Sequence, residues 1–467
     1  MTNPELTRTD LEGKEFLVVG LARSGLAAAN FLITHGARVT VTDLQTRNEL
    51  GEIVDRLSSA VQLSLGGHRP DEFLGVDTIV LSPGVPRSIP VLQAAASEGV
   101  EIISEVELGY RFIEGSFVGV TGSNGKTTTT TLIGEILRKA GKKQVVAGNI
   151  GTPLTSFIDD PSVNDKETTF VVELSSFQLE TVVQLRCNIA LMLNITPDHM
   201  DRYADFDAYR AAKSRIFQNQ TAKDFAVVNV DDPDALAAST GIESRLFPFS
   251  SERQLETGAF LKSNELQIRW KKQELSILSV DDLKLKGTHN IENALAAASA
   301  AFLLGVSKKA TVDAIREFPG VEHRLEFVLR YRGVDYYNDS KATNVDSAIR
   351  AIQAFDQPLV LIMGGLDKHT DFSTLRAAIS NNVVQVILLG TAKEKLASVL
   401  SDRVKVVESD SLENAVQIAS QSASAGQIVL LAPACASFDM FDDYEHRGRV
   451  FKQSVRRLSE RGDRKDI

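Results

Sequence analysis

A run of small, polar and basic residues has the composition of a phosphate-binding loop. Residues 119–128 read GVTGSNGKTT; an apolar stretch precedes them, and apolar residues at helical spacing follow over 129–137. A strand, a loop and a helix are therefore expected, and the backbone N–H groups of the loop and the helix start can surround a polyphosphate. Lys126 can then reach the terminal phosphates, and Thr127 can hold Mg²⁺.

The loop departs from the usual G-x-x-x-x-G-K-[ST] spacing. Five residues rather than four separate Gly119 from Gly125. A glycine- and serine-rich surface turn is the alternative interpretation. The run G-x-x-G-K-T-T between a predicted strand and a predicted helix nevertheless favours nucleotide binding.

Two further predicted strands in this region run into polar residues. One ends at Glu173, and the other leads from 189–193 into a segment that contains His199. Mg²⁺ is usually held by one or two protein groups, with phosphate and water completing its shell. Glu173 and His199 are therefore candidate Mg²⁺ ligands, although each alone is more typical of a satisfied structural group.

Two predicted helices carry polar residues whose roles stay open at this point. Lys213 lies beside the apolar stripe of a helix predicted over 206–219, and the pattern alone favours a lysine that extends to solvent. Asn290 and Asn293 share one face of an alanine-rich helix. These two asparagines are candidates either for capping that helix or for recognising a base.

The chain begins with a strand, a helix and a strand over residues 15–43. Their first turn, GLARSG at 20–25, resembles the dinucleotide fingerprint G-x-G-x-x-G with Ala22 at the middle glycine, and Asp43 ends the second strand. The Cβ of Ala22 hinders the close approach of a pyrophosphate, so a differently bound nucleotide is as reasonable as a nicotinamide cofactor. The loop Ser82–Gly84 follows a later strand and is either a ligand loop or a structural turn.

Beyond residue 322 a third region of alternating strands and helices carries basic and hydroxyl residues where strands end. These residues are Lys341, Thr343, Lys368 and Ser437. A cationic, hydroxyl-rich pocket of this kind suits a dicarboxylate.

The elements that must position these residues belong to an α/β protein. The 467 residues suggest about three domains at roughly 150 residues each, and strands that are apolar along their length predict parallel sheets covered on both faces. A net charge of −10 argues against a nucleic-acid partner. Cys187 and Cys435 lie in apolar segments and are expected to be buried thiols. With no secretory leader and no apolar run near ~18 residues, we expect a cytoplasmic protein.

Taken together, these motifs resemble the Mur ligase family over essentially the whole length. The signatures are SPGVP at 82–86, TGSNGKTT at 121–128, ELSSFQ at 173–178, NITPDHMDRY at 194–203 and NDSKATN at 338–344. The family's longer phosphate loop accounts for the unusual spacing. The resemblance implies an α/β fold of three domains: a Rossmann-like UDP-sugar domain at 1–114, a central P-loop ATPase domain with a mostly parallel sheet at 115–321, and a Rossmann-like domain for the incoming amino acid at 322–467.

The resemblance also implies a role for each candidate residue. It places the UDP substrate near Arg23, Ser24, Asp43, Ser82, Pro83, Gly84 and Asn149. It places ATP on Gly122, Ser123, Asn124, Gly125, Lys126, Thr127, Thr128, Asn290, Asn293, Arg324 and Asp339. It places D-glutamate on Thr343, Lys368, Ser437 and Phe438. It assigns Mg²⁺, two ions being expected, to Thr127, Glu173, His199 and, once carbamylated, Lys213. Its catalytic residues are Lys126, Glu173, His199, Lys213 and Lys341.

The implied reaction is the ATP-dependent ligation of D-glutamate to UDP-N-acetylmuramoyl-L-alanine through an acyl phosphate, in peptidoglycan precursor synthesis. The stretch 338–344 indicates the D-glutamate-adding member of the family, because related ligases for other amino acids carry another motif there. The implied partners are small molecules, with neither nucleic acid nor membrane insertion, and a monomer is expected.

Three alternatives stay open from the sequence. They are a folylpolyglutamate-synthetase-like ligase, a nucleotide-switched binding protein and an NAD-binding dehydrogenase. A folylpolyglutamate-synthetase-like ligase would bind and use ATP in the same way, but such ligases lack a leading UDP-binding domain. A GTPase-like switch should carry a base-specificity motif such as N-K-x-D, which is not found, and a dehydrogenase leaves the Lys126 loop unexplained.

Overall fold

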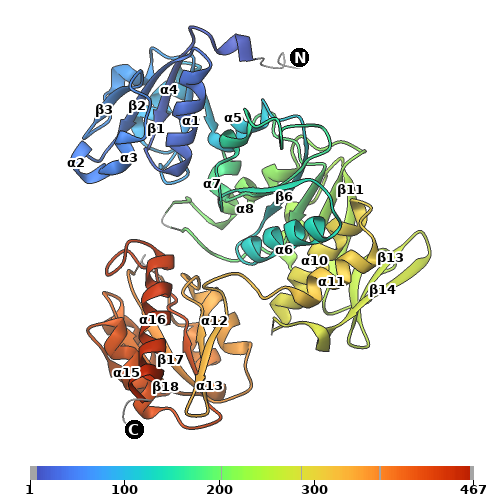
Figure 1. The fold of residues 1–467 in the computed structure, drawn as a ribbon, viewed down its shortest axis with the longest axis vertical. Coiled ribbons are helices and arrows are strands. Elements are labelled where there is room, and N and C mark those ends of the chain that lie inside the picture. Colours follow the sequence, from blue (N-terminus) through green and yellow to red (C-terminus); the bar gives the residue numbers. More distant parts are fainter. Residues whose placement is uncertain (1–7, 201, 286, 368–369, 463–467) are drawn as a thin grey trace. The chain divides into compact units, whose positions relative to one another are not determined.

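The computed structural model describes residues 8–200, 202–285, 287–367 and 370–462. These residues form three β-sheets with flanking helices (Figure 1). The chain divides into two compact units, Met1–Ser279 with Glu292–Ile315 and Val280–Ile291 with Arg316–Ile467. The first unit contains the first two sheets, and the second unit contains the third.

The first sheet has the parallel strand order β3-β2-β1-β4-β5, which a doubly wound, Rossmann-like fold adopts. Its elements are η1 (Arg8–Leu11), β1 (Glu15–Val19), α1 (Arg23–Thr34), β2 (Arg38–Asp43), α2 (Arg47–Leu50), α3 (Glu52–Asp55), β3 (Gln62–Leu65), η2 (Pro70–Phe73), β4 (Thr78–Leu81), α4 (Pro90–Ser97) and β5 (Glu101–Ser104), followed by α5 (Glu105–Tyr110). Phe16 and Val18 face one buried cluster, and Leu17 and Val19 face another. Both faces of the sheet are therefore covered, as its continuous apolar strands predict.

The second sheet has the order β14-β13-β12-β11-β10-β9-β6-β8-β7 and is parallel except for the β12–β13–β14 meander. Its elements are β6 (Ser116–Thr121), α6 (Lys126–Lys139), β7 (Gln144–Gly148), η3 (Leu154–Phe157), β8 (Thr169–Glu173), α7 (Ser176–Leu179), β9 (Ile189–Met192), α8 (Phe206–Ser214), η4 (Arg215–Phe217), β10 (Phe225–Asn229), α9 (Pro233–Ala238), β11 (Arg245–Ser250), β12 (Gly258–Lys262), β13 (Glu265–Trp270), β14 (Gln273–Ser279), η5 (Val280–Asp282), α10 (Thr288–Leu303) and α11 (Lys308–Glu317). Strand β6 lies between β8 and β9, so the segments that follow these two strands lie on either side of the phosphate loop.

The third sheet has the order β15-β16-β20-β17-β18-β19, with β15 alone antiparallel to its neighbour. Its elements are β15 (Glu326–Tyr331), β16 (Val334–Asn338), α12 (Val345–Gln353), β17 (Leu359–Gly364), α13 (Leu375–Asn382), β18 (Val383–Leu389), α14 (Lys393–Leu400), β19 (Lys405–Glu408), α15 (Leu412–Ser422), β20 (Ile428–Leu431) and α16 (Tyr444–Gly462). One face of the sheet packs against α12, α13 and α14, and the other packs against α15 and α16 (Figure 1).

These sheets confirm the predicted α/β class with three mostly parallel sheets. The domain boundaries at 114/115 and 321/322 stay predictions. Cys187 and Cys435 are buried and unpaired, as expected. Among the described residues, no helix combines the length and apolarity that crossing a membrane requires.

Candidate active site

The phosphate loop joins the end of β6 to the start of α6 and depends on two glycines. Gly122 and Gly125 have φ values of 153° and 85°, which side chains other than glycine rarely allow. A Cβ on Gly125 would also overlap Asn293 Oδ1, which accepts a hydrogen bond from Thr129 Oγ1 at 3.2 Å. The two glycines therefore keep side chains away from the N-terminus of α6, where the first backbone N–H groups of the helix can bind a phosphate.

Asn194 fixes the shape of this loop, and the sequence interpretation gave it no role. Its backbone oxygen accepts from Ser123 N at 2.9 Å, and its side-chain oxygen accepts from Asn124 N at 2.8 Å. Its amide nitrogen in turn donates to Asn124 O at 3.1 Å. Its position inside the motif at 194–203 indicated importance, but these contacts span 70 residues and no local pattern reveals them.

Two lysine ammonium groups meet at one carbonyl oxygen of the loop. Lys126 Nζ donates to Gly122 O at 2.7 Å and to Ser123 O at 2.8 Å, and Lys213 Nζ donates to Gly122 O at 2.8 Å. The pattern-based reading of Lys213 as a solvent-facing lysine is wrong, because this residue is only 1% exposed. Burial, together with the nearby charge of Lys126, holds the pKa of Lys213 well below its usual value.

Glu173 is the last residue of β8, its carboxylate is buried, and only one of its two oxygens accepts a hydrogen bond from a described residue. Its Oε1 accepts from Asn149 Nδ2 at 2.9 Å, whereas Oε2 is buried and has no hydrogen-bond partner among the described residues. A buried carboxylate oxygen of this kind fits a hard cation such as Mg²⁺. Asn149, which the resemblance assigned to the UDP substrate, lies beside this carboxylate.

The other predicted Mg²⁺ ligands lie on segments that border the same loop. Thr127 is buried in the first turn of α6. His199 lies after β9 in a left-handed conformation with φ 57°, and its ring meets the Phe177 ring edge-on at 4.8 Å. Thr128 is buried next to Thr127, and its Oγ1 also has no hydrogen-bond partner among the described residues. The structure thus places Glu173 at the end of β8 and His199 after β9, the two strands that flank β6.

Apart from Asn149, the residues predicted to hold the UDP substrate gather where β1, β2 and β4 end. Asp43 accepts from Leu21 N at 2.7 Å and from Gln45 N at 2.9 Å, so its carboxylate ties the first turn to the loop after β2. Ser82 Oγ donates to Gly20 O at 2.7 Å. Arg23 and Ser24 open α1, Pro83 and Gly84 follow β4, and Gly84 O accepts from Arg202 at 3.1 Å. Carboxyl ends of parallel strands are where ligands bind in open α/β sheets.

Helix α10 begins at Thr288, so Asn290 lies in its first turn and Asn293 one turn further on. In the second unit, Asp339 is buried, and this burial raises the pKa of its carboxyl to about 6. Leu325 N donates to Asp339 Oδ1 at 3.2 Å, and the positive charge of Arg324 acts on the same carboxyl. Arg324 and Asp339 are therefore neighbours, as a shared nucleotide role requires.

The predicted amino-acid pocket lies on the loops after β16 and β20. Lys341 Nζ donates to Tyr444 Oη at 3.3 Å, and Thr343 follows it in the same loop. Ser437 is buried and Phe438 is 66% exposed. Lys368 lies outside the described residues.

Arg447 joins these two loops, and sequence reasoning missed it. Its buried guanidinium donates to Ser340 O at 2.8 Å and to Cys435 O at 3.1 Å. Burial lowers the pKa of Arg447 to about 10. In the sequence this residue looks like one of several arginines on a polar helix, and only its tertiary contacts distinguish it.

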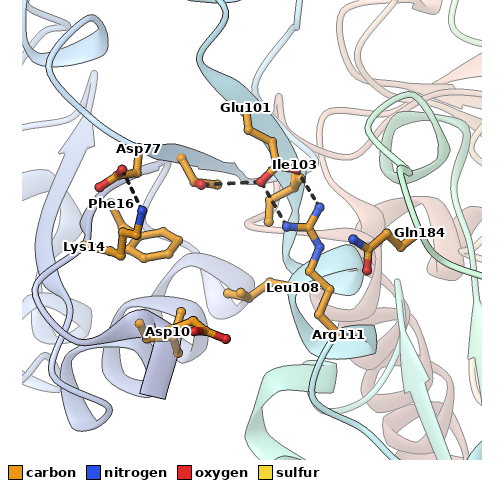
Figure 2. A pocket seen from close by; sticks show the side chains of 11 residues that line it. Asp10, Lys14, Phe16, Asp77, Glu101, Ile103, Leu108, Arg111 and Gln184 are labelled. Carbon is orange, nitrogen blue, oxygen red and sulfur yellow. Dashed lines mark hydrogen bonds and ion pairs between the residues drawn. The ribbon is translucent and has the colours of Figure 1, made fainter. Parts of the chain in front are cut away.

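A separate cavity of about 370 Å³ lies at the opposite end of the first sheet, where β1, β4 and β5 begin (Figure 2). Its charged lining is paired internally: Arg111 donates to Glu101 at 2.7 and 2.9 Å, and Lys14 donates to Asp77 at 3.2 Å. None of the residues predicted from the sequence to bind a ligand lines this cavity.

Comparison with known families matches three consecutive segments of the chain. Residues 14–104 match the Mur ligase MurD-like N-terminal domain, residues 120–301 match the Mur ligase middle domain, and residues 323–435 match the Mur ligase glutamate ligase domain.

Similar curated proteins match over almost their whole length. The chain is 47% identical to the UDP-N-acetylmuramoylalanine–D-glutamate ligase of Acidobacterium capsulatum, covering 97% of this chain and 98% of that one. It is 45% identical to the protein of the same name from Koribacter versatilis, covering 97% and 99%.

Solved structures share the fold at low identity. The pseudomurein peptide ligase type C of Methanothermus fervidus aligns with a TM-score of 0.60 at 18% identity, covering 96% of this chain and 100% of that one. The UDP-N-acetylmuramate-alanine ligase MurC of Thermotoga maritima aligns with a TM-score of 0.58 at 19% identity, covering 96% and 99%. FolC of E. coli aligns with a TM-score of 0.57 at 17% identity, covering 76% and 94%. From the three matched segments and the full-length relatives, the chain belongs to the Mur ligase family.

Proposed function

We propose that this protein ligates D-glutamate to UDP-N-acetylmuramoyl-L-alanine, with conversion of ATP to ADP and phosphate, in peptidoglycan precursor synthesis. The observation that carries the proposal is the full-length similarity to relatives named for this reaction. A folylpolyglutamate-synthetase-like activity is not favoured, because residues 14–104 match a MurD-like N-terminal domain.

The reaction joins a carboxylate to an amine in two steps. The alanyl carboxylate attacks the γ-phosphorus of ATP, ADP leaves, and an acyl phosphate remains. The amine of D-glutamate then attacks the acyl carbon; phosphate leaves as the C–N bond forms, and the amine loses a proton. Each step brings anions together, so the site must supply positive charge and N–H donors where negative charge develops.

The phosphate loop provides these groups for the nucleotide. The backbone N–H groups from Gly125 to Thr128, at the start of α6, face the phosphates, because Ser123 N and Asn124 N already donate to Asn194. Lys126 neutralises the oxygens of the transferred group. In the structure Lys126 donates to two loop carbonyls. A phosphate oxygen is a stronger acceptor than a carbonyl, so we expect Lys126 to exchange these bonds for phosphate when ATP binds.

Glu173, Thr127 and His199 would hold Mg²⁺, which supplies positive charge to the phosphate oxygens when it is bound. The spare buried oxygen of Glu173 supports this assignment. Lys213 joins them if it is carbamylated: its neutral amine adds to CO₂, an N–C bond forms, and one proton is released. Its depressed pKa supports the step, because only the neutral amine is nucleophilic.

The second unit would bind the remaining groups. Asn290, Arg324 and Asp339 of this unit would contact the nucleotide. In the first unit, Asn293, whose side chain lies beside Gly125 of the phosphate loop, is assigned to the nucleotide as well. Lys341 neutralises charge in the transition state. Thr343, Lys368, Ser437 and Phe438 receive D-glutamate. The proposed partners are small molecules, and the proposed state and location are a cytoplasmic monomer.

Phosphate release from ATP and Mg²⁺ with UDP-N-acetylmuramoyl-L-alanine tests this proposal. We expect release with D-glutamate and background release with L-glutamate or no amino acid, together with a product one glutamyl residue heavier by mass spectrometry. Release that requires another amino acid would reject the specificity but keep the ligase chemistry. Absence of release under every condition would reject the function.

A further inference from the structure

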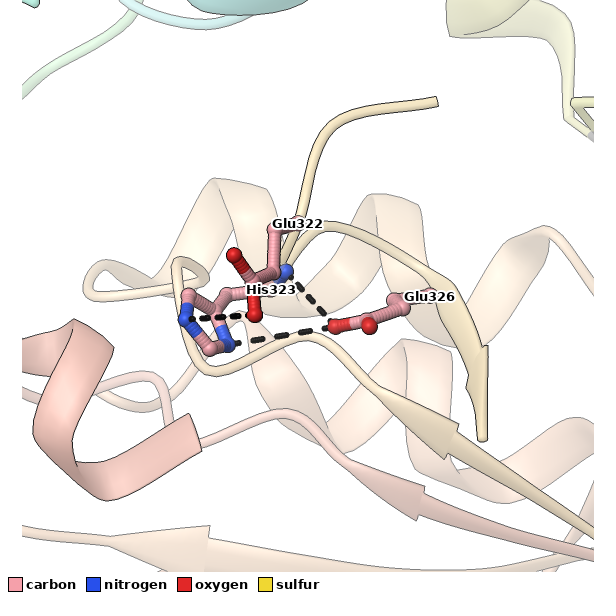
Figure 3. A group of neighbouring side chains, drawn as sticks. All are labelled: Glu322, His323 and Glu326. Carbon is pink, nitrogen blue, oxygen red and sulfur yellow. Dashed lines mark hydrogen bonds and ion pairs between the residues drawn. The ribbon is translucent and has the colours of Figure 1, made fainter. Parts of the chain in front are cut away.

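A group of acidic and imidazole side chains in the second unit resembles a metal site. Glu322, His323 and Glu326 each offer a ligand atom, and these atoms lie within 4.8 Å of one another (Figure 3). A lysine already supplies the cation, however. Lys452 Nζ, on α16, donates to Glu322 and, at 2.9 Å, to Glu326 Oε1. Its side chain is only 10% exposed, so the ammonium is largely withdrawn from water.

The same helix accommodates His323 one turn earlier. A Cβ on Gly448 would overlap the His323 ring, so Gly448 and Lys452, four residues apart, present space and charge on one face of α16. His323 has φ 65°, a conformation that its surroundings must maintain. His323 N donates to Glu326 Oε2 at 2.9 Å, and Asn338 Nδ2 donates to the same oxygen at 3.0 Å.

This segment is bonded directly to residues of the proposed site. His323 O accepts from Lys341 N at 3.1 Å. On the other side of Arg324, Leu325 N donates to Asp339 Oδ1 at 3.2 Å. Arg324 therefore lies between two residues whose backbones are fixed to the loop that carries Asp339 and Lys341.

We propose that Lys452 is a positioning residue that holds Glu322 and Glu326 and thereby fixes Arg324 against the 338–344 loop. The inference rests on the proposed function, which assigns Arg324 and Asp339 to the nucleotide. Without the ammonium, two carboxylates face each other beside a strained residue, and the backbone around Arg324 relaxes away from its place.

The test compares Lys452→Met with Lys452→Arg, which keeps the charge, and with Arg456→Met, which removes an exposed cation one turn later on α16. For Lys452→Met we expect KM for ATP to rise about tenfold while kcat changes less than about threefold. Lys452→Arg should restore most of the affinity, and Arg456→Met should match the wild type. Glu326→Gln alone, which removes a carboxylate that Lys452 contacts, is an independent variant and should also raise KM for ATP.

Three outcomes would overturn the proposal. The first is an unchanged KM for ATP in Lys452→Met with no other change. The second is an unchanged KM for ATP together with a fall in kcat and Tm, which a purely structural role produces. The third is binding of Zn²⁺ to the wild-type protein that His323→Ala removes, because the cluster would then hold a metal instead of the lysine.

Direct binding of a non-hydrolysable ATP analogue separates this proposal from the proposed function. If the wild type shows no D-glutamate-dependent phosphate release but Lys452→Met weakens analogue binding, the function fails and the positioning role stands. If the wild type is active and Lys452→Met binds the analogue normally, the function stands and the positioning role fails.

Discussion

The phosphate loop region buries Lys213 and Glu173, and the Glu322–Glu326 segment buries Lys452, but the two regions balance these charges differently. Around the loop, the direct contacts of Lys213 are Gly122 O and the face of the Tyr209 ring at 4.7 Å, and the charges of Asp198 and Glu173 act on it from further away. Glu173 Oε2 has no hydrogen-bond partner among the described residues. In the other segment, Lys452 contacts two carboxylates.

This difference is the one that we expect between a ligand-binding site and a scaffold that is complete by itself. A buried charge without a partner costs free energy, and proteins retain such groups mainly where a ligand completes them. A buried charge that contacts its oppositely charged partners instead fixes the backbone segments that carry them relative to one another. Proximity of ionisable residues alone therefore does not mark a binding site, because the imbalance of their contacts is the informative feature.

The largest expected effect comes from removing the ammonium group of Lys126 in the phosphate loop. Lys126→Ala should lower kcat by about a thousandfold, because its charge is needed as negative charge develops on the transferred phosphoryl group. Its KM for D-glutamate should change little. Lys139→Ala, an exposed position at the end of the same helix, serves as the control. Steady-state phosphate release measures both, and an unchanged kcat would remove Lys126 from the chemistry.

Glu105 tests whether an unbalanced buried charge always implies a ligand. Its Oε1 accepts from Thr155 N at 2.6 Å and Thr155 Oγ1 at 2.7 Å, whereas its Oε2 has no hydrogen-bond partner among the described residues. Here no cation appears among the groups that act on the carboxyl, and burial raises its pKa to about 7 from 4.5. Below about pH 7, a bound proton rather than a cation therefore neutralises the Glu105 carboxyl.

The sign of the pH dependence follows from this raised pKa. Between about pH 4.5 and 7 the folded protein binds a proton that the unfolded chain has lost, so the stability contribution of Glu105 falls as pH rises through this window. Glu105→Gln keeps both bonds from Thr155 and cannot ionise. At pH 8 it should be more stable than the wild type by about 3 kcal/mol, and at pH 4.5 nearly equal. Urea denaturation at both pH values measures this, and an equal gain at both would contradict it.

The two buried lysines should respond to the same substitution with opposite signs. Lys452→Met removes the partner of two carboxylates and should lower the free energy of unfolding by about 2 kcal/mol. Lys213→Met removes an amine with neutral contacts and should raise the free energy of unfolding by about 1 kcal/mol, while activity is lost. Parallel urea titrations at pH 7.5 measure both changes. If both substitutions lowered the free energy of unfolding, Lys213 would be a stabilising residue and the contrast between the two lysines would fail.

These lysines also mark the limit of what the sequence predicts. The strand–loop–helix around Lys126 is local, because glycine spacing and periodicity within about twenty residues specify it, and β6 and α6 lie where expected. Lys213 meets Gly122 across 91 residues, and Lys452 meets Glu326 across 126. Periodicity reports only which face of a helix is apolar, so it described Lys213 as solvated and gave no role to Arg447 or Lys452.

The smallest expected effect concerns a charge pair that is matched but exposed. Lys14 and Asp77, at the rim of the cavity in Figure 2, lie 3.2 Å apart with side chains 52% and 42% exposed. Water and salt screen such a pair, so Lys14→Ala should change the free energy of unfolding by less than about 0.5 kcal/mol.

Arg111 lines the same cavity and provides the matched contrast to Lys14. Its side chain is 3% exposed and contacts both Glu101 and Glu107. Arg111→Met should therefore cost about 3 kcal/mol, because it leaves the buried Glu107 carboxylate without its cation and with only the backbone N–H donors of residues 183–185. Urea denaturation at low and high salt measures both variants, and only the Lys14→Ala difference should vanish with salt. Equal costs for the two substitutions would mean that charge balance stabilises this protein regardless of burial, and the distinction between the phosphate loop and the Lys452 segment would then lose its physical basis.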